Sequence, residues 1–196
     1  MKQLGFAFVA AIAVGASVPV SAQSLTGAGY DLTEAVKKSD ANKALQVLAT
    51  NPPGIVNTKD GDGNTPLLIA IARNDEQWAG FMLNKGADPN LAGKDGNTPL
   101  IAASRVGMAQ AVEWLLGLGA KVDATNRMGE TPLIVAVQQR NLPIARLLLS
   151  KGANPDKTDS AAGYSARDYA TRDGRSREIL KLIEDKKPKT AAAAAK

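Results

Sequence analysis

The stretch Lys59-Asp-Gly-Asp-Gly-Asn-Thr-Pro-Leu-Leu-Ile-Ala70 decides the fold of this chain, and it allows two interpretations. Asp60, Asp62 and Asn64 occupy alternate positions, with glycines between them, which is how a calcium-binding loop begins. The same residues also suit a tight turn, because glycine and aspartate favour turn conformations. The equivalent positions elsewhere in the chain distinguish the two interpretations.

Two short motifs return along the chain with a constant period of 33 residues. They are Thr-Pro-Leu, at residues 65–67, 98–100 and 131–133, and Gly-Ala, at residues 86–87, 119–120 and 152–153. Self-similarity at a fixed period of this length is typical of stacked-repeat proteins. The sequence therefore predicts a repeat architecture rather than a single globular core.

The repeat argues against the calcium-binding interpretation. A calcium loop of that type needs glycine at its sixth position and a bidentate acid at its twelfth. Counted from Asp60, those positions hold Thr65 and Ile71, and the equivalent turns at 94–97 and 127–130 lose the aspartate pattern. We therefore predict a hairpin tip that leads into a helix, with no metal site.

Each repeat unit has the signals of two short helices. Thr65 and its equivalents suit a helix N-cap, and the proline that follows suits the first helical position. A second helix with leucine-type core positions ends at the glycine of Gly-Ala, which suits a helix C-cap. Trp78 and Trp114 fall at core spacing in these second helices, so we interpret both as packing residues.

On these motifs the chain resembles the ankyrin repeat family, and more narrowly its exported bacterial members. The resemblance implies a mainly α solenoid of helix-turn-helix units joined by β-hairpin-like loops, with about five units including caps. Three units match closely. One departure concerns the family's usual histidine after Thr-Pro-Leu, whose place is taken by Leu68, Ile101 and Ile134. We expect apolar contact to replace the lost hydrogen bond between neighbouring turns.

The chain then divides into a leader, a repeat domain and a tail. We predict a signal peptide at 1–22, a short linker at 23–30, an ankyrin repeat domain at 31–185 and a disordered Lys/Ala tail at 186–196. Within the repeat domain we expect an N-cap unit at 31–57, three units at 58–90, 91–123 and 124–156, and a C-cap unit at 157–185.

The leader has the features of an export signal. Lys2 precedes an uncharged run from Leu4 to Val18, and the small residues Val20-Ser-Ala22 predict cleavage after Ala22. A membrane anchor is the alternative, but the run is shorter than the roughly 20 apolar residues that span a bilayer. We expect export to the bacterial periplasm, with secretion as the alternative, and no stable membrane insertion after cleavage.

The composition argues against catalysis. The chain has no cysteine and no histidine, so it cannot use disulfides, thiolate nucleophiles or histidine bases. Paired acids occur only in the predicted turns. We therefore expect no enzyme, no catalytic residue, no cofactor and no metal.

The resemblance implies a protein partner bound in the concave groove. Among the residues that match groove positions, those we expect to bind the partner are Arg73, Lys85, Lys94, Arg105, Val106, Leu118, Arg127, Met128, Gln138, Gln139, Lys151 and Tyr164. Basic residues outnumber acids among the groove positions, which favours a partner with an acidic surface. The apolar residues Val106, Leu118 and Met128 are the expected binding hot spot.

Two other roles stay open at the level of sequence. The chain could be a secreted effector that binds a host or rival protein, or a structural protein that tethers to the envelope through its basic tail. The net charge of +5 is mild, so no nucleic-acid partner is expected. A capped solenoid has polar ends, so we expect a monomer.

Overall fold

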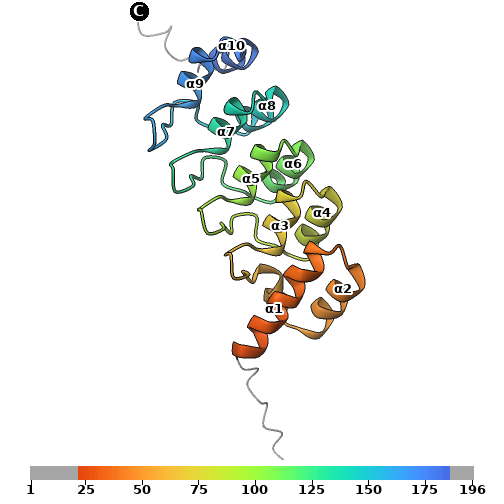
Figure 1. Cartoon of the computed structure of the whole chain (residues 1–196). Coiled ribbons are helices and arrows are strands. Elements are labelled where there is room, and N and C mark those ends of the chain that lie inside the picture. The colour runs from red at the N-terminus through yellow and green to blue at the C-terminus, as the bar shows by residue number, and fades with distance from the viewer. Residues whose placement is uncertain (1–21, 186–196) are drawn as a thin grey trace, which may run out of the picture.

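A computed structural model describes residues 22–185 of the chain (Figure 1). This part is mainly helical and contains ten α-helices and one 3-10 helix. The elements are α1 (Ala22–Lys37), α2 (Ala41–Thr50), η1 (Pro53–Asn57), α3 (Pro66–Ala72), α4 (Glu76–Asn84), α5 (Pro99–Val106), α6 (Ala109–Gly117), α7 (Pro132–Gln138), α8 (Leu142–Ser150), α9 (Ala166–Arg172) and α10 (Arg177–Asp185).

The helices pair and stack into an elongated solenoid, which confirms the predicted fold. The odd-numbered helices α1 to α9 form one row and the even-numbered helices α2 to α10 a second, outer row, with the loops projecting on the other side of the first row (Figure 1). Each odd-numbered helix packs on the next one in its row. Neighbouring units therefore bury a continuous core between them.

The repeated threonine and proline start the first helix of each full unit, as predicted. The hydroxyl oxygens of Thr65, Thr98 and Thr131 each accept a hydrogen bond from the backbone N–H three residues ahead, at 3.1–3.3 Å. Each cap satisfies one of the N–H groups that a helix start leaves without a partner. The proline at the next position has no N–H to satisfy.

The connecting loops are hairpin-like but form no extended strands. Within residues 22–185 the one β-bridge joins Thr158 and Ser165. Three loops are closed by a backbone hydrogen bond between residues four apart: Asp60 N–H to Asn64 at 2.9 Å, Gly93 N–H to Asn97 at 3.0 Å and Asn126 N–H to Glu130 at 3.2 Å. Hairpin 1 (residues 60–64), hairpin 2 (93–97) and hairpin 3 (126–130) therefore keep one shape, and a fourth hairpin spans 159–164.

The core is aliphatic. Leu68, Ile101 and Ile134 are buried, with Ile101 and Ile134 fully so, which agrees with the expectation that apolar contact replaces the missing histidine. Trp78 and Trp114 are half-buried and pack against this core. The Trp114 ring lies over Gly80, where an added Cβ would meet it at 3.2 Å.

The N-terminal unit differs from its predicted outline. Residues 23–30, predicted from the sequence to be a linker, are helical and belong to α1. The predicted cleavage region up to residue 21 and the tail at 186–196 lie outside the described residues. No helix within residues 22–185 combines the length and the apolar character needed to cross a membrane.

Candidate protein-binding groove

A hollow of about 530 Å³ opens between hairpins 1 and 2. Leu68 and Ala72 of α3 form one wall, and Arg105 and Val106 at the end of α5 form the other. Lys94 at the tip of hairpin 2 also lines it. Three of the predicted groove residues, Lys94, Arg105 and Val106, are thus brought together at one place.

Two of the predicted groove residues are exposed apolar side chains. Val106 is 37% exposed and is the last residue of α5, which ends there because Gly107 takes a left-handed conformation with φ 80°. Met128 is 49% exposed at the tip of hairpin 3. Exposed apolar side chains beside charged ones are typical of binding surfaces.

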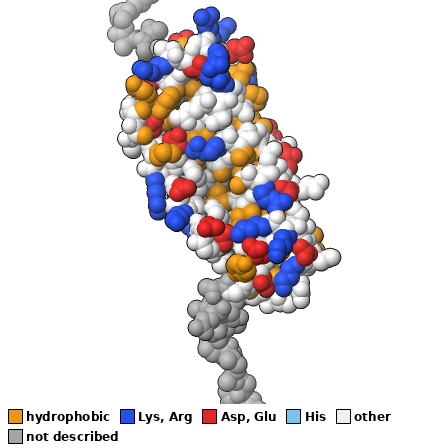
Figure 2. All heavy atoms as spheres, in the orientation of Figure 1, with side chains coloured by type: hydrophobic (Ala, Val, Ile, Leu, Met, Phe, Trp, Pro, Cys, Tyr) orange, Lys and Arg blue, Asp and Glu red, His pale blue; other side chains and the backbone are white. Residues whose placement is uncertain are grey.

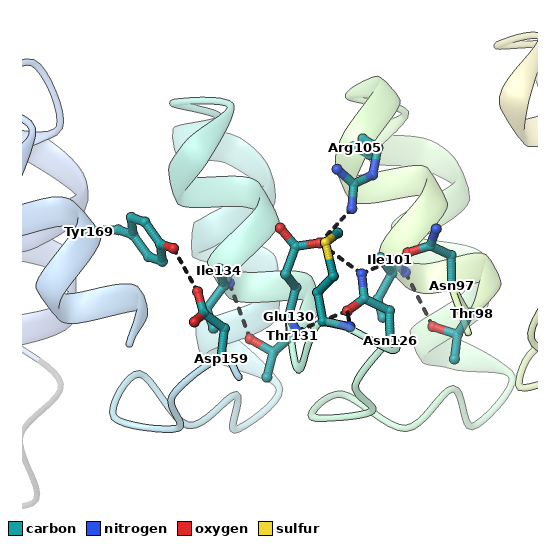
Figure 3. A network of polar contacts seen from close by, with 11 residues as sticks. Asn97, Thr98, Ile101, Arg105, Asn126, Glu130, Thr131, Ile134, Asp159 and Tyr169 are labelled. Carbon is teal, nitrogen blue, oxygen red and sulfur yellow. Dashed lines mark hydrogen bonds and ion pairs between the residues drawn. The ribbon is translucent and has the colours of Figure 1, made fainter. Parts of the chain in front are cut away.

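A polar network connects α5 with hairpins 2 and 3 (Figure 3). Arg105 donates to Glu130 Oε2 at 2.8 Å, and Asn126 Nδ2 donates to the same oxygen at 2.7 Å. The amide of Asn126 also donates to Asn97 Oδ1 at 3.0 Å. The predicted groove residue Arg105 is therefore part of the scaffold and has its charge paired within the chain.

Arg73 has a similar internal role. Its guanidinium donates to the carbonyl of Val36 at 3.2 Å and to the hydroxyl of Ser39 at 3.1 Å. These contacts tie α3 to the end of α1 in the N-terminal unit. Because these two bonds hold the guanidinium against the N-terminal unit, Arg73 has fewer free donors for a partner than its predicted role requires.

Three predicted groove residues lie elsewhere. Lys85, Leu118 and Lys151 are the C-cap residues of α4, α6 and α8, which belong to the outer row. Leu118 lines a separate hollow with Gly80 and Trp114 of that row. The Lys85 ammonium lies 5.5 Å from the ring centre of Phe81. Leu118 is thus not grouped with Val106 and Met128, because the second helix of each unit ends in the outer layer.

The remaining predicted residues lie toward the C-terminal end of the groove. Tyr164 packs edge-on against Tyr169 at 5.6 Å and beneath Arg172 at 4.5 Å. Gln138 lines a shallow hollow with Tyr169. Gln139 is exposed at the end of α7. The side chain of Arg127 makes no hydrogen bond or ion pair with the described residues, and it extends from hairpin 3.

Charges of both signs line the hollow, where Lys94 and Arg105 lie with Asp62 and Asp95, and they are mixed over the face of the molecule seen in Figure 1. Figure 2 shows Lys and Arg side chains beside Asp and Glu side chains, with apolar side chains between them. With Arg73 and Arg105 engaged inside the chain, Lys94 and Arg127 are the cations that extend freely from the hairpin tips. These two rim residues are therefore the cations most available to a partner.

The residues that shape the hairpins occupy their first position, where sequence reasoning singled out Asp60 and missed Asn126 and Asp159. Asp60, Asn126 and Asp159 each accept hydrogen bonds from two N–H groups of their own loop. Burial would raise the pKa of Asp159, but the Tyr169 hydroxyl at 2.6 Å and the loop N–H groups hold that pKa below its usual value. The sequence signal that could have identified these residues is an Asp or Asn five residues before the capping Thr, or six residues before the capping Ser in the fourth hairpin.

The same hydrogen bonds are found in the stretch that opens at Lys59. Asp60 Oδ1 accepts from the N–H groups of Asp62 and Asn64, and Oδ2 lies 3.3 Å from the Lys37 ammonium. Within residues 22–185 no group of three or more acidic, histidine or cysteine side chains could hold a metal ion. Asp60 shapes the turn.

Comparison with known families agrees with this geometry. A family model described as ankyrin repeats (3 copies) matches residues 32–126, 79–159 and 102–191. The chain belongs to the ankyrin repeat family. No curated protein matches it closely enough to add a more specific relationship. Ankyrin repeats are protein–protein interaction modules, and proteins built from them are generally non-catalytic.

Proposed function

We propose that this ankyrin repeat chain is a non-catalytic adaptor that binds a partner protein along its hairpin tips and first helices. The observation that carries the proposal is the exposed apolar residue Val106 in the lining of the hollow at hairpin 2, together with a second exposed apolar residue, Met128, at the tip of hairpin 3. Arg105, Asn126 and Glu130 hold the surrounding scaffold in one arrangement. A rigid surface loses little conformational freedom on docking, which favours binding.

The partner has an acidic rim facing Lys94 and Arg127. These two exposed side chains belong to hairpins 2 and 3. Rim charges of this kind mainly raise the association rate and its dependence on salt. The expected contribution of the basic residues is therefore steering, while the apolar pair supplies most of the affinity.

The site of action is the bacterial periplasm. The proposal rests on the export signal in the first 22 residues of the sequence, together with the absence of cysteine, which suits an exported chain that folds without disulfides. Fractionation of cells that express the full chain tests this part. Recovery in the periplasmic fraction is expected, and recovery in the culture medium would favour the secreted effector.

The binding surface is tested by crosslinking and affinity capture with the full chain. The variant Val106→Glu with Met128→Glu should lose the captured partner. A matched control places two glutamates on the outer face at Leu45 and Leu118, which are 47% and 55% exposed. Loss of the partner in the first variant alone supports the groove. Loss in the control alone would move the binding surface to the outer helices.

A further inference from the structure

Hairpin 2 lacks a contact that the other hairpins have. The first residue of hairpins 1, 3 and 4 is Asp60, Asn126 or Asp159, and its Oδ1 atom accepts two backbone N–H groups at 2.7–3.0 Å. In hairpin 2 this position is Gly93, which has no side chain. The equivalent N–H groups, those of Asp95 and Asn97, have no acceptor within residues 22–185.

The contact between hairpins 1 and 2 is also looser than its equivalents. Arg127 N–H donates to the Asp95 carbonyl at 3.1 Å, and Ser160 N–H donates to the Met128 carbonyl at 2.8 Å. The matching bond from Lys94 N–H to Asp62 is not formed in the described structure. A Cβ built on Gly63 would lie 3.4 Å from Lys94 N, whereas the equivalent distances are 2.9 Å at Gly96 and 2.5 Å at Gly129.

The contact between hairpins 2 and 3 shows which chemical group fits the equivalent position over Gly93. There the Asn126 carboxamide accepts from two N–H groups of hairpin 3 and donates to Asn97 Oδ1 of hairpin 2. The counterpart of Asn97 is Asn64, whose Oδ1 lies 3.5 Å from a Cβ built on Gly93. This Asn64 oxygen accepts no hydrogen bond from the described residues. Two donors and one acceptor thus face the hollow.

The charges around the hollow favour a neutral group over a carboxylate. Lys94 is accompanied by Asp62 and Asp95, which also line the hollow. The remaining cation, Arg105, is paired with Glu130 at 2.8 Å. A carboxylate would therefore enter a site with no excess of positive charge to offset its own negative charge. A carboxamide is neutral and needs no such compensation.

We propose that the hollow over Gly93 receives a side-chain carboxamide, from asparagine or glutamine, of the partner protein. Its oxygen accepts from the N–H groups of Asp95 and Asn97, and its NH2 group donates to Asn64 Oδ1. The partner thereby completes the hairpin contact that Gly93 leaves open. This subsite rests on the proposed function, because it lies within the same groove.

The test uses the full chain labelled with 15N and three peptides, acetyl-Gly-Gly-X-Gly-Gly-dimethylamide with X as Gln, Glu or Met, so that only the Gln peptide carries a primary carboxamide. Methionine has the size of glutamine without its amide, and all three peptides share one backbone. The Gln peptide should move the Asp95 and Asn97 amide resonances in a saturable way. Its binding should be about tenfold tighter than that of the other two, since it alone makes both kinds of hydrogen bond.

Two variants sharpen this experiment. Gly93→Asn places a carboxamide in the hollow from within the chain and should abolish the Gln-peptide response. Its matched control is Gly61→Asn in hairpin 1, where an added Cβ meets no atom within 4 Å, so the response should persist. Asn64→Ala removes the acceptor and should erase the preference for Gln over Met, which keeps the test informative if Gly93→Asn folds poorly.

Equal responses to the Gln and Met peptides, tighter binding of the Glu peptide, or no response at all would overturn the carboxamide subsite. Partner capture that depends on Val106 and Met128 would then still stand, because that experiment does not involve the peptides. Conversely, a Gln-specific response without any groove-dependent partner would leave the subsite in place and remove the proposed adaptor role.

Discussion

The guanidinium of Arg105 lies 2.8 Å from Glu130 Oε2 and joins the end of α5 to hairpin 3. Glu130 is only 8% exposed and also accepts from Asn126, which is itself buried. One carboxylate thus ties a helix to a hairpin in the next unit. The surface that carries Val106 and Met128 is fixed by this connection.

The energetic coupling of Arg105 and Glu130 can be measured with a double-mutant cycle. Glu130→Ala should lower the free energy of unfolding by about 2 kcal/mol, because Arg105 and Asn126 both lose an acceptor. Arg105→Ala should cost about 1 kcal/mol, since its side chain is partly exposed. Urea unfolding of the single and double variants should give a coupling of about 1 kcal/mol. Strictly additive losses would mean that the two residues act independently.

Two glycines with the same backbone conformation but different surroundings form a matched pair. Gly86 and Gly129 have φ values of 87° and 77°. A Cβ on Gly86 meets nothing within 4 Å, whereas on Gly129 it would lie 2.5 Å from the Ser160 backbone nitrogen. Gly86→Ala should cost only the left-handed strain of about 1–2 kcal/mol.

Gly129→Ala should cost clearly more, because hairpin 4 must move away and the hydrogen bond from Ser160 to Met128 is lost. Urea unfolding midpoints of the two variants compare these costs directly. Similar losses would show that the hairpins move apart freely.

The sequence predicts the fold almost completely because the same physical signals are repeated. Thr65 and its equivalents cap helices in the predicted positions. The C-cap residues of the second helices lie one residue before the predicted glycines, and those glycines, which begin with Gly86, take the left-handed conformation just past the helix end. Each signal acts locally, so its effect can be read without knowing the neighbouring units. The N-terminal end of α1 was missed because residues 23–30 carry no cap or period that separates a helix from a linker.

The site was less predictable, because side-chain partners come from adjacent units. Arg73 and Arg105 occupy groove positions by alignment, yet both have acceptors in neighbouring units, at Val36 and Glu130. Leu118 is exposed, as expected of a contact residue, but belongs to the outer row. The partner of each side chain depends on how adjacent units stack. The 33-residue period alone does not specify these partners.

Acid should weaken the C-terminal unit through Asp173. The Arg140 guanidinium at 2.7 Å, with the Arg175 N–H and the Ser176 hydroxyl, lowers the pKa of Asp173 to about 2 from an ordinary 3.8. Because the unfolded chain binds more protons between these values, the stabilising contribution is present above pH 3.8 and is lost as the pH falls through 2. Urea unfolding of the wild type and Asp173→Asn should therefore differ most near pH 6.

The difference between wild type and Asp173→Asn should shrink steadily toward pH 2. Arg140→Gln removes the largest cause of the lowered pKa and should flatten the same part of the pH profile. A difference that stays constant across the range would show that Asp173 acts without its charge.

Arg73 and Arg127 are predicted to have different roles, Arg73 in stability and Arg127 in partner binding. Arg73→Ala should cost about 1 kcal/mol, because Val36 and Ser39 lose their donors, and it should increase hydrogen exchange in α1 while partner capture persists. Arg127→Ala should leave exchange unchanged, since its side chain has no partner among the described residues, but should slow partner association at low salt. Slower association in Arg73→Ala with unchanged exchange would restore Arg73 to the binding surface and remove its proposed role in holding the N-terminal unit.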